Sequence, residues 1–170
     1  RRNEAQAPAS GFFEVRVEGL QPARERYENN FNTPSDDFIG VDFRIETPPG
    51  FLNPAIHSDH PYKDGTGPNN ESNYTYQLKF PIKINANRSF IRFDEIALIE
   101  PGEPGTVFGQ IPFWDYVIVE GSTDGGLTWR RAGNGYDARE HSEWLTTYNS
   151  TIVNGNSLAP GTPSLFKPRI

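Results

Sequence analysis

The side chains best suited to metal chemistry gather in an irregular stretch, residues 52–73, that is rich in Pro, Gly and Asn. His57, Asp59 and His60 combine imidazole and carboxylate groups, which zinc and other transition metals use as ligands. Their spacing matches no standard zinc signature, and Pro61 restricts the backbone beside them. The favoured interpretation is that these side chains are hydrogen-bonded anchors of a long loop.

Calcium is a better candidate cofactor than zinc, because it binds about six to eight oxygens from carboxylates and loop carbonyls. Four carboxylates lie in or beside irregular segments and form the candidate calcium set: Asp36, Asp37, Asp59 and Asp64. No Asp-x-Asp-x-Asp-Gly loop accompanies them, so no cofactor is assigned with certainty.

Hydrolysis would need a pair of carboxylates or a nucleophile with a base. Asp94 and Glu95 are neighbours on an expected strand and point to opposite faces, and Pro101 interrupts the segment just after Glu100. The chain contains neither a Gly-x-Ser-x-Gly elbow nor a His-Glu-x-x-His helix. The sequence therefore predicts a protein that is not an enzyme.

Aromatic side chains could stack sugars, but at alternating strand positions they are more often part of a core. Trp144 lies in an irregular polar segment and is expected to be the most exposed ring. Together with Tyr62 and His60 of the long loop, Trp144 forms the candidate ligand-binding set.

A hairpin signature is the strongest local pattern. The octet Ser-Thr-Asp-Gly-Gly-Leu-Thr-Trp at residues 122–129 has the spacing of an Asp box, with Ser122, Asp124, Gly126, Thr128 and Trp129 at its fixed positions. The two glycines tolerate positive φ, and Asp124 can accept backbone N–H bonds across the turn. The Trp129 indole is expected to pack beneath the loop as a large buried ring. The octet predicts a self-capped hairpin without catalytic chemistry.

The elements that must position these residues are short apolar runs divided by Gly, Pro, Asn and Asp. Alternation predicts strands within residues 13–17, 38–45, 74–84, 90–99, 114–121 and 128–131. Residues 21–30 could form one short helix, and residues 143–145 one helical turn. This pattern predicts an all-β fold, a two-sheet antiparallel β-sandwich of the jelly-roll type. Residues 1–11 are expected to be a linker or extended arm, and residues 12–170 a single sandwich domain.

Composition excludes several classes of protein. The 170 residues carry a net charge of −6 and contain neither Cys nor Met, so no disulfide or cysteine metal site can form. Between residues 94 and 143, ten carboxylates stand against three arginines, a balance that disfavours nucleic acid. No apolar run approaches the roughly 20 residues of a membrane-spanning helix. Asn70, Asn73, Asn87 and Asn149 begin Asn-x-Ser/Thr sequons.

A family resemblance rests on longer motifs. These are Asp-Glu-Ile-Ala-Leu-Ile-Glu-Pro-Gly-Glu at 94–103, Phe-Trp-Asp-Tyr-Val-Ile-Val-Glu-Gly-Ser at 113–122, Gly-Tyr-Asp at 135–137 and Trp-Leu at 144–145. Over residues 36–170 the chain resembles jelly-roll modules, concanavalin-like or MAM-like, of bacterial surface proteins exported by type IX secretion. The resemblance implies a non-catalytic accessory region beside a protease, adhesin or sorting domain.

Two functions are therefore expected. The first is a structural or interaction module of a secreted or cell-surface bacterial protein. The alternative is a carbohydrate-binding module attached to an enzyme domain elsewhere in the polypeptide. The expected partners are other domains of the same polypeptide, neighbouring surface proteins or a glycan. The expected number of strands falls short of a jelly roll, so the last strands are expected to lie elsewhere in the polypeptide or to come from another copy by strand donation.

Overall fold

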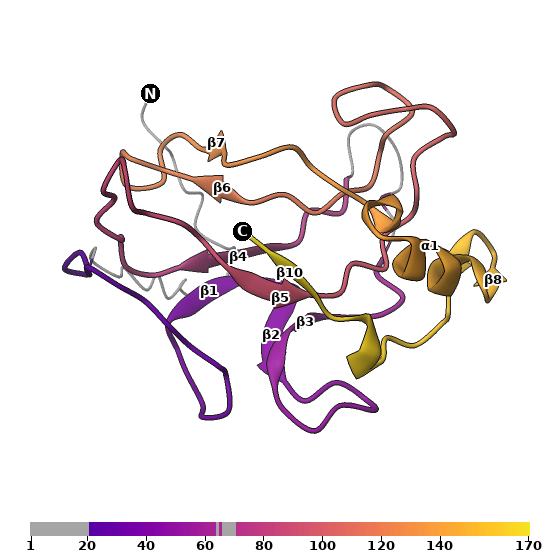
Figure 1. The fold of residues 1–170 in the computed structure, drawn as a ribbon, viewed down its shortest axis with the longest axis horizontal. Coiled ribbons are helices and arrows are strands. Elements are labelled where there is room, and N and C mark those ends of the chain that lie inside the picture. Colours follow the sequence, from indigo (N-terminus) through magenta and orange to yellow (C-terminus); the bar gives the residue numbers. More distant parts are fainter. Residues whose placement is uncertain (1–20, 64, 66–70) are drawn as a thin grey trace, which may run out of the picture.

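The computed structural model describes residues 21–63, 65 and 71–170 and shows a β-rich chain with one α-helix (Figure 1). The strands are β1 (Phe38–Val41), β2 (Phe43–Glu46), β3 (Ala55–Ser58), β4 (Thr75–Leu78), β5 (Phe93–Glu95), β6 (Glu120–Gly121), β7 (Arg130–Arg131), β8 (Ile152–Val153), β9 (Asn156–Ser157) and β10 (Lys167–Arg169). The helices are α1 (Ser142–Asn149) and two 3₁₀ turns, η1 (Ala138–Glu140) and η2 (Pro163–Leu165). The expected arm at 1–11 and strand at 13–17 lie outside the described residues.

The described strands pair antiparallel, two by two: β1 with β4, β2 with β3, β5 with β10, β6 with β7 and β8 with β9. This arrangement agrees with an all-β expectation at the level of class, and the described strands close no barrel. The single strand expected at 38–45 is two strands, because Asp42 between them has φ +63°. The chain therefore turns at Asp42, which lets β1 pair with β4 and β2 with β3.

Residues 21–30 do not form the short helix that was expected, so this prediction was wrong. The Arg24 N–H donates to the Pro81 carbonyl (2.9 Å), and the Arg24 carbonyl accepts from the Lys83 N–H (2.9 Å). The Arg24 guanidinium also lies over the Phe80 ring, 3.4 Å from its centroid. These contacts engage the backbone groups that a helix would need, so the segment stays extended beside residues 81–83.

Packing rather than long ladders holds the sheets. Phe38 of β1 stacks on Tyr76 of β4, with ring centroids 5.0 Å apart and planes 7° from parallel. Tyr27 packs edge-on against Phe38 and Phe80. Aromatic pairs of this kind add roughly 0.5–1.5 kcal/mol each beyond the area they bury.

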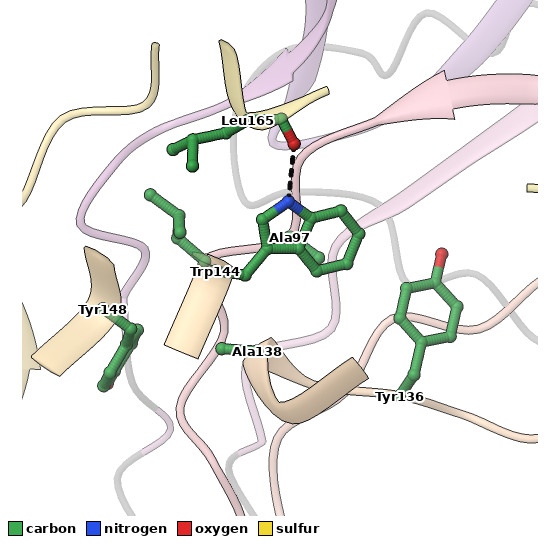
Figure 2. Packing of buried hydrophobic residues seen from close by; sticks show 7 residues of the cluster. Ala97, Tyr136, Ala138, Trp144, Tyr148 and Leu165 are labelled. Carbon is green, nitrogen blue, oxygen red and sulfur yellow. Dashed lines mark hydrogen bonds between the residues drawn. The ribbon is translucent and has the colours of Figure 1, made fainter. Parts of the chain in front are cut away.

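The main core forms around α1, where helix formation was expected at residues 143–145. Its buried members are Ala97, Leu98, Tyr136, Ala138, Trp144, Tyr148 and Leu165 (Figure 2). Trp144 has no exposed surface, and its indole N–H donates to the Leu165 carbonyl at 2.7 Å. The expectation that Trp144 is an exposed ring was therefore wrong, because helix α1 turns this position toward the core.

The segment before Ile170 is attached to this core by β10. Arg169 pairs with Glu95 of β5, and its guanidinium lies 3.5 Å from the centroid of the Tyr136 ring. The Tyr136 hydroxyl donates to the other oxygen of Glu95 at 2.5 Å. Burial, and then this hydrogen bond to a carboxylate, raise the pKa of Tyr136 above its ordinary range. Across the described residues, no helix has the length and apolar character that a membrane span requires.

Replacing Trp144 should identify the core directly. We expect Trp144→Ala to lower the free energy of unfolding by about 3–5 kcal/mol, since it removes a fully buried ring. Trp144→Phe should cost about 1–3 kcal/mol, because it leaves the Leu165 carbonyl without its donor. Urea denaturation measures both. Trp114→Ala is the matched control: this ring is 72% exposed, so the change should stay within about 0.5 kcal/mol. Equal losses at both tryptophans would contradict the assignment.

Candidate functional site

The polar side chains of the Asp-box turn form hydrogen bonds within the turn. One oxygen of Asp124 accepts from the Thr128 N–H (2.9 Å) and the Ser122 hydroxyl (2.8 Å), and the other accepts from the Thr128 hydroxyl (2.6 Å). The Gly126 N–H donates to Ser122 Oγ at 2.8 Å. Gly125 and Gly126 have φ of +74° and +89°, which only glycine adopts without strain. The carboxylate is therefore committed to the turn and not directed toward a ligand.

Trp129 lies against the Asp-box turn but is not the buried ring that was expected. A Cβ built on Gly126 would lie 3.6 Å from the indole, so the ring lies against the turn as expected. However, Trp129 is 43% exposed, so the prediction of a large buried ring was wrong. The physical reason is that β6 and β7 are themselves exposed, so this hairpin lies at the surface and offers the indole no core to enter. Truncating Trp129 should therefore cost less than the loss of a core ring.

The candidate ligand-binding residues of the long loop make contacts within the chain. His60 Nε2 lies 2.8 Å from the Ala159 carbonyl. The Tyr62 hydroxyl donates to Asp115 (2.6 Å) and accepts from the Glu100 N–H (3.0 Å). Burial, and then the bond to Asp115, raise the pKa of Tyr62 well above its ordinary value. These contacts tie the loop to distant segments, and with Trp144 buried the three predicted residues do not form one binding surface.

The structure does not assemble the candidate calcium set. Asp59 is 2.6 Å from Arg44 Nη2, and Asp37 accepts from the Ser35 hydroxyl (2.8 Å) and the Tyr27 hydroxyl (3.1 Å). The Asp36 side chain is almost fully exposed, with its nearest cation 3.8 Å away. Asp64 lies outside the described residues. Within the described part of the chain, no three His, Asp or Glu side chains are placed to share a metal ion.

An ion pair between a buried carboxylate and a partly exposed guanidinium organises residues 137–139. The Asp137 side chain is 2% exposed and accepts from the Gly102 N–H at 2.9 Å and the Arg139 N–H at 2.7 Å. Its carboxylate also holds the Arg139 guanidinium, with Nη2 at 2.8 Å. Arg139 Nη1 in turn donates to the carbonyls of Glu103 (3.2 Å) and Thr106 (3.1 Å). The buried carboxylate is thus both paired and hydrogen-bonded, which offsets the cost of removing its charge from water.

Arg139 braces a closed loop that the sequence did not reveal. At the base of residues 103–113, the Glu103 N–H donates to the Pro112 carbonyl at 3.2 Å. Inside the loop, Phe108 packs edge-on against Phe113, with ring centroids 6.1 Å apart. Arg139 lies over the Phe113 ring, 4.9 Å from its centroid. A loop whose ends meet and whose own side chains fill it is an Ω-loop, a class that frequently carries function. The repeated Glu-Pro-Gly at 100–105 signals a turn, but nothing in the sequence shows that its ends meet.

A shallow depression of about 500 Å³ opens between this loop and the chain leading to η1. Its wall on the loop side includes Val107 and Phe108, and its opposite wall includes Asn134 and Glu140. The Asp137–Arg139 pair contributes to its lining. The depression combines an aromatic ring with amide and carboxylate groups, which can stack on a ligand and form hydrogen bonds to it.

No protein family, curated protein or solved structure matches the chain. Over the described residues the fold is that of a β-rich protein with one α-helix, small antiparallel sheets and a braced surface loop.

The Asp-box turn predicts a pH-dependent stability. Hydrogen bonds from Thr128 and Ser122 lower the pKa of Asp124 to about 2 from an ordinary 3.8. A lowered pKa means that the stabilisation is complete above about pH 4 and is lost as the pH falls toward 2. We expect the difference in melting temperature between wild type and Asp124→Ala to shrink over that window. The difference in melting temperature between wild type and Leu127→Ala, a change at an exposed neighbour, should not vary with pH. A difference in melting temperature for Asp124→Ala that is constant from pH 6 to 2 would contradict stabilisation of the turn by the ionised carboxylate.

Removing the buried carboxylate should release the Ω-loop. We expect Asp137→Ala to destabilise the chain by about 3 kcal/mol, because it leaves Arg139 without its partner. Hydrogen exchange should also accelerate at residues 103–113 more than in β1 and β4. Asp94→Asn, at an exposed carboxylate, is the control and should leave both measurements unchanged. Uniform acceleration over the whole chain would show that the pair acts on global stability alone.

Proposed function

We propose that this chain is a non-catalytic interaction module of a secreted or cell-surface bacterial protein. The resemblance of residues 36–170 to jelly-roll modules of type IX-exported proteins supports this proposal. The expected location is outside the cell, and the expected partners are other domains of the same polypeptide or neighbouring surface proteins.

One observation carries the proposal: the described chain leaves many large apolar side chains in solvent. Trp114 is 72% exposed, Ile111 77% and Phe90 76%. Exposed apolar side chains of this size gain free energy when a partner removes them from water. At the same time Glu95, one of the carboxylates considered for hydrolysis, is held by Arg169 and by the Tyr136 hydroxyl. The surface thus favours contact with a partner over chemistry on a substrate.

The sandwich architecture is part of the same proposal. On β1, Phe38 faces the aromatic cluster, while Ile39 and Val41 lie on the other face and are 54% and 59% exposed. This second apolar face is open among the described residues, and a further layer packed on it would complete a sandwich. The Asp-box turn also lies beside β4, because a Cβ placed on Gly126 would be 4.0 Å from Gln77 Nε2. This closeness favours a second layer over that strand.

The alternative function, carbohydrate binding, is favoured by the exposed indoles. Trp114 and Trp129 present 72% and 43% of their surface, and an exposed ring face can stack on a sugar. Glycan binding therefore remains the second candidate.

One experiment separates the two functions. Surface material from a type IX-secreting bacterium is immobilised and treated either with a broad protease or with periodate, which destroys glycans. We expect labelled chain to bind the untreated and the periodate-treated material and to lose binding after proteolysis. Loss after periodate alone would replace the proposal with the carbohydrate-binding alternative. Absence of binding to untreated material, or release of new amino termini or reducing sugars by the chain, would contradict the proposed function.

A further inference from the structure

The Ω-loop at 103–113 presents apolar side chains on a rigid support. Val107, Ile111 and the adjacent Trp114 are 61%, 77% and 72% exposed, and we call these three side chains the apolar knob. The loop rises clear of the sheets at the upper right of Figure 1. Besides the bond at its base, its backbone closes through Gln110 N–H to the Val107 carbonyl (3.1 Å) and Phe113 N–H to the Gln110 carbonyl (3.0 Å).

This support reduces the cost of binding. Arg139 fixes the loop from inside through the Glu103 and Thr106 carbonyls, and the buried Asp137 fixes Arg139. A loop already held in one conformation loses little conformational entropy when a partner binds. Exposed Val, Ile and Trp side chains gain free energy when they leave water. The apolar knob is thus preorganised for contact, although it contributes nothing to the core.

Charge around the knob selects the partner. Residues 93–129 contain seven carboxylates and no Lys or Arg. Glu103, at the base of the loop, is exposed and forms no ion pair with another described residue. Glu140, which lines the depression, is 43% exposed and pairs with Arg169 at 3.5 Å. Because Arg169 also pairs with Glu95, the two carboxylates share one guanidinium and keep a net negative charge. Two arginines reach the loop. Arg139 is paired with Asp137, while Arg131, whose guanidinium lies 5.7 Å from the Phe108 ring centroid, offsets one of these carboxylates.

We propose that the apolar knob, with the depression beside it, is a docking surface for a polypeptide segment that carries apolar side chains and a net positive charge. The inference rests on the proposed interaction function and names the surface and the partner chemistry. Apolar residues of the segment would pack on Ile111 and Trp114, and its basic residues would lie near Glu103 and Glu140. Complementary charge of this kind raises the association rate and selects among partners.

A peptide selection tests this chemistry without knowledge of the natural partner. A random twelve-residue phage library is selected on the whole chain after depletion on the double variant Ile111→Ser/Trp114→Ser. We expect the recovered peptides to combine large apolar residues with an excess of Lys and Arg. A synthetic copy should bind Trp114→Ser or Ile111→Ser roughly tenfold more weakly than wild type. Its binding to wild type should weaken as salt is added, and this salt dependence should decrease in Glu103→Gln.

The controls separate this inference from misfolding and from the proposed function. Leu127→Ser changes an 85% exposed side chain on the Asp-box turn and should leave peptide affinity unchanged. All variants should keep the wild-type melting temperature. Peptides that are neutral or acidic, or that bind the knob variants equally well, would overturn the inference. If the chain still binds protease-sensitive surface material while the knob variants bind it equally well, the interaction function stands and this surface is the wrong one.

Discussion

The Asp137 carboxylate is the group on which most of the described arrangement depends. It caps the 3₁₀ turn η1 through the Arg139 N–H, and η1 leads into α1, whose Trp144 fills the core. Its other contacts reach across the chain to the Gly102 N–H and, through Arg139, to the Glu103 and Thr106 carbonyls. A carboxylate that is 2% exposed is costly to bury unless it is paired and hydrogen-bonded, as Asp137 is by these contacts. The contacts of this one carboxylate therefore connect the core, the helix and the Ω-loop.

Short strands make such contacts more important. Ladders of two to four residues supply few backbone hydrogen bonds, and isolated two-stranded hairpins are marginal in water. The chain compensates with rings and guanidinium groups, as in Phe38 on Tyr76, Arg24 on Phe80 and Arg169 on Tyr136. These contacts connect segments far apart in sequence. They therefore add tertiary contacts to ladders that are short by themselves.

The three tryptophans show how one residue type serves three environments. Trp144 is fully buried and donates to Leu165, Trp129 leans on the Asp-box turn, and Trp114 stands largely in solvent. Periodicity placed Trp114 in a strand and Trp144 in a polar segment, which suggested the opposite order of burial. Only packing decides such cases, because a side chain is buried by residues distant in sequence. Arg139 is a similar case, since the carbonyls it holds come from a loop more than thirty positions earlier.

The sequence by itself determined the local structure. The Asp-box octet predicted a turn stabilised by Asp124 because all its hydrogen-bonding partners lie within four residues. Alternation located β1 with β2, β4, β5 and the hairpin of β6 and β7, and a helical turn was expected where α1 begins. Tertiary structure decided what short-range patterns cannot encode. Arg24 stays extended because residues 81–83 bind its backbone, Asp59 is taken by Arg44 instead of a metal, and residues 103–113 close into a loop because Arg139 reaches them. In each case the deciding partner is a charge or a backbone group that only the folded chain brings within hydrogen-bonding distance.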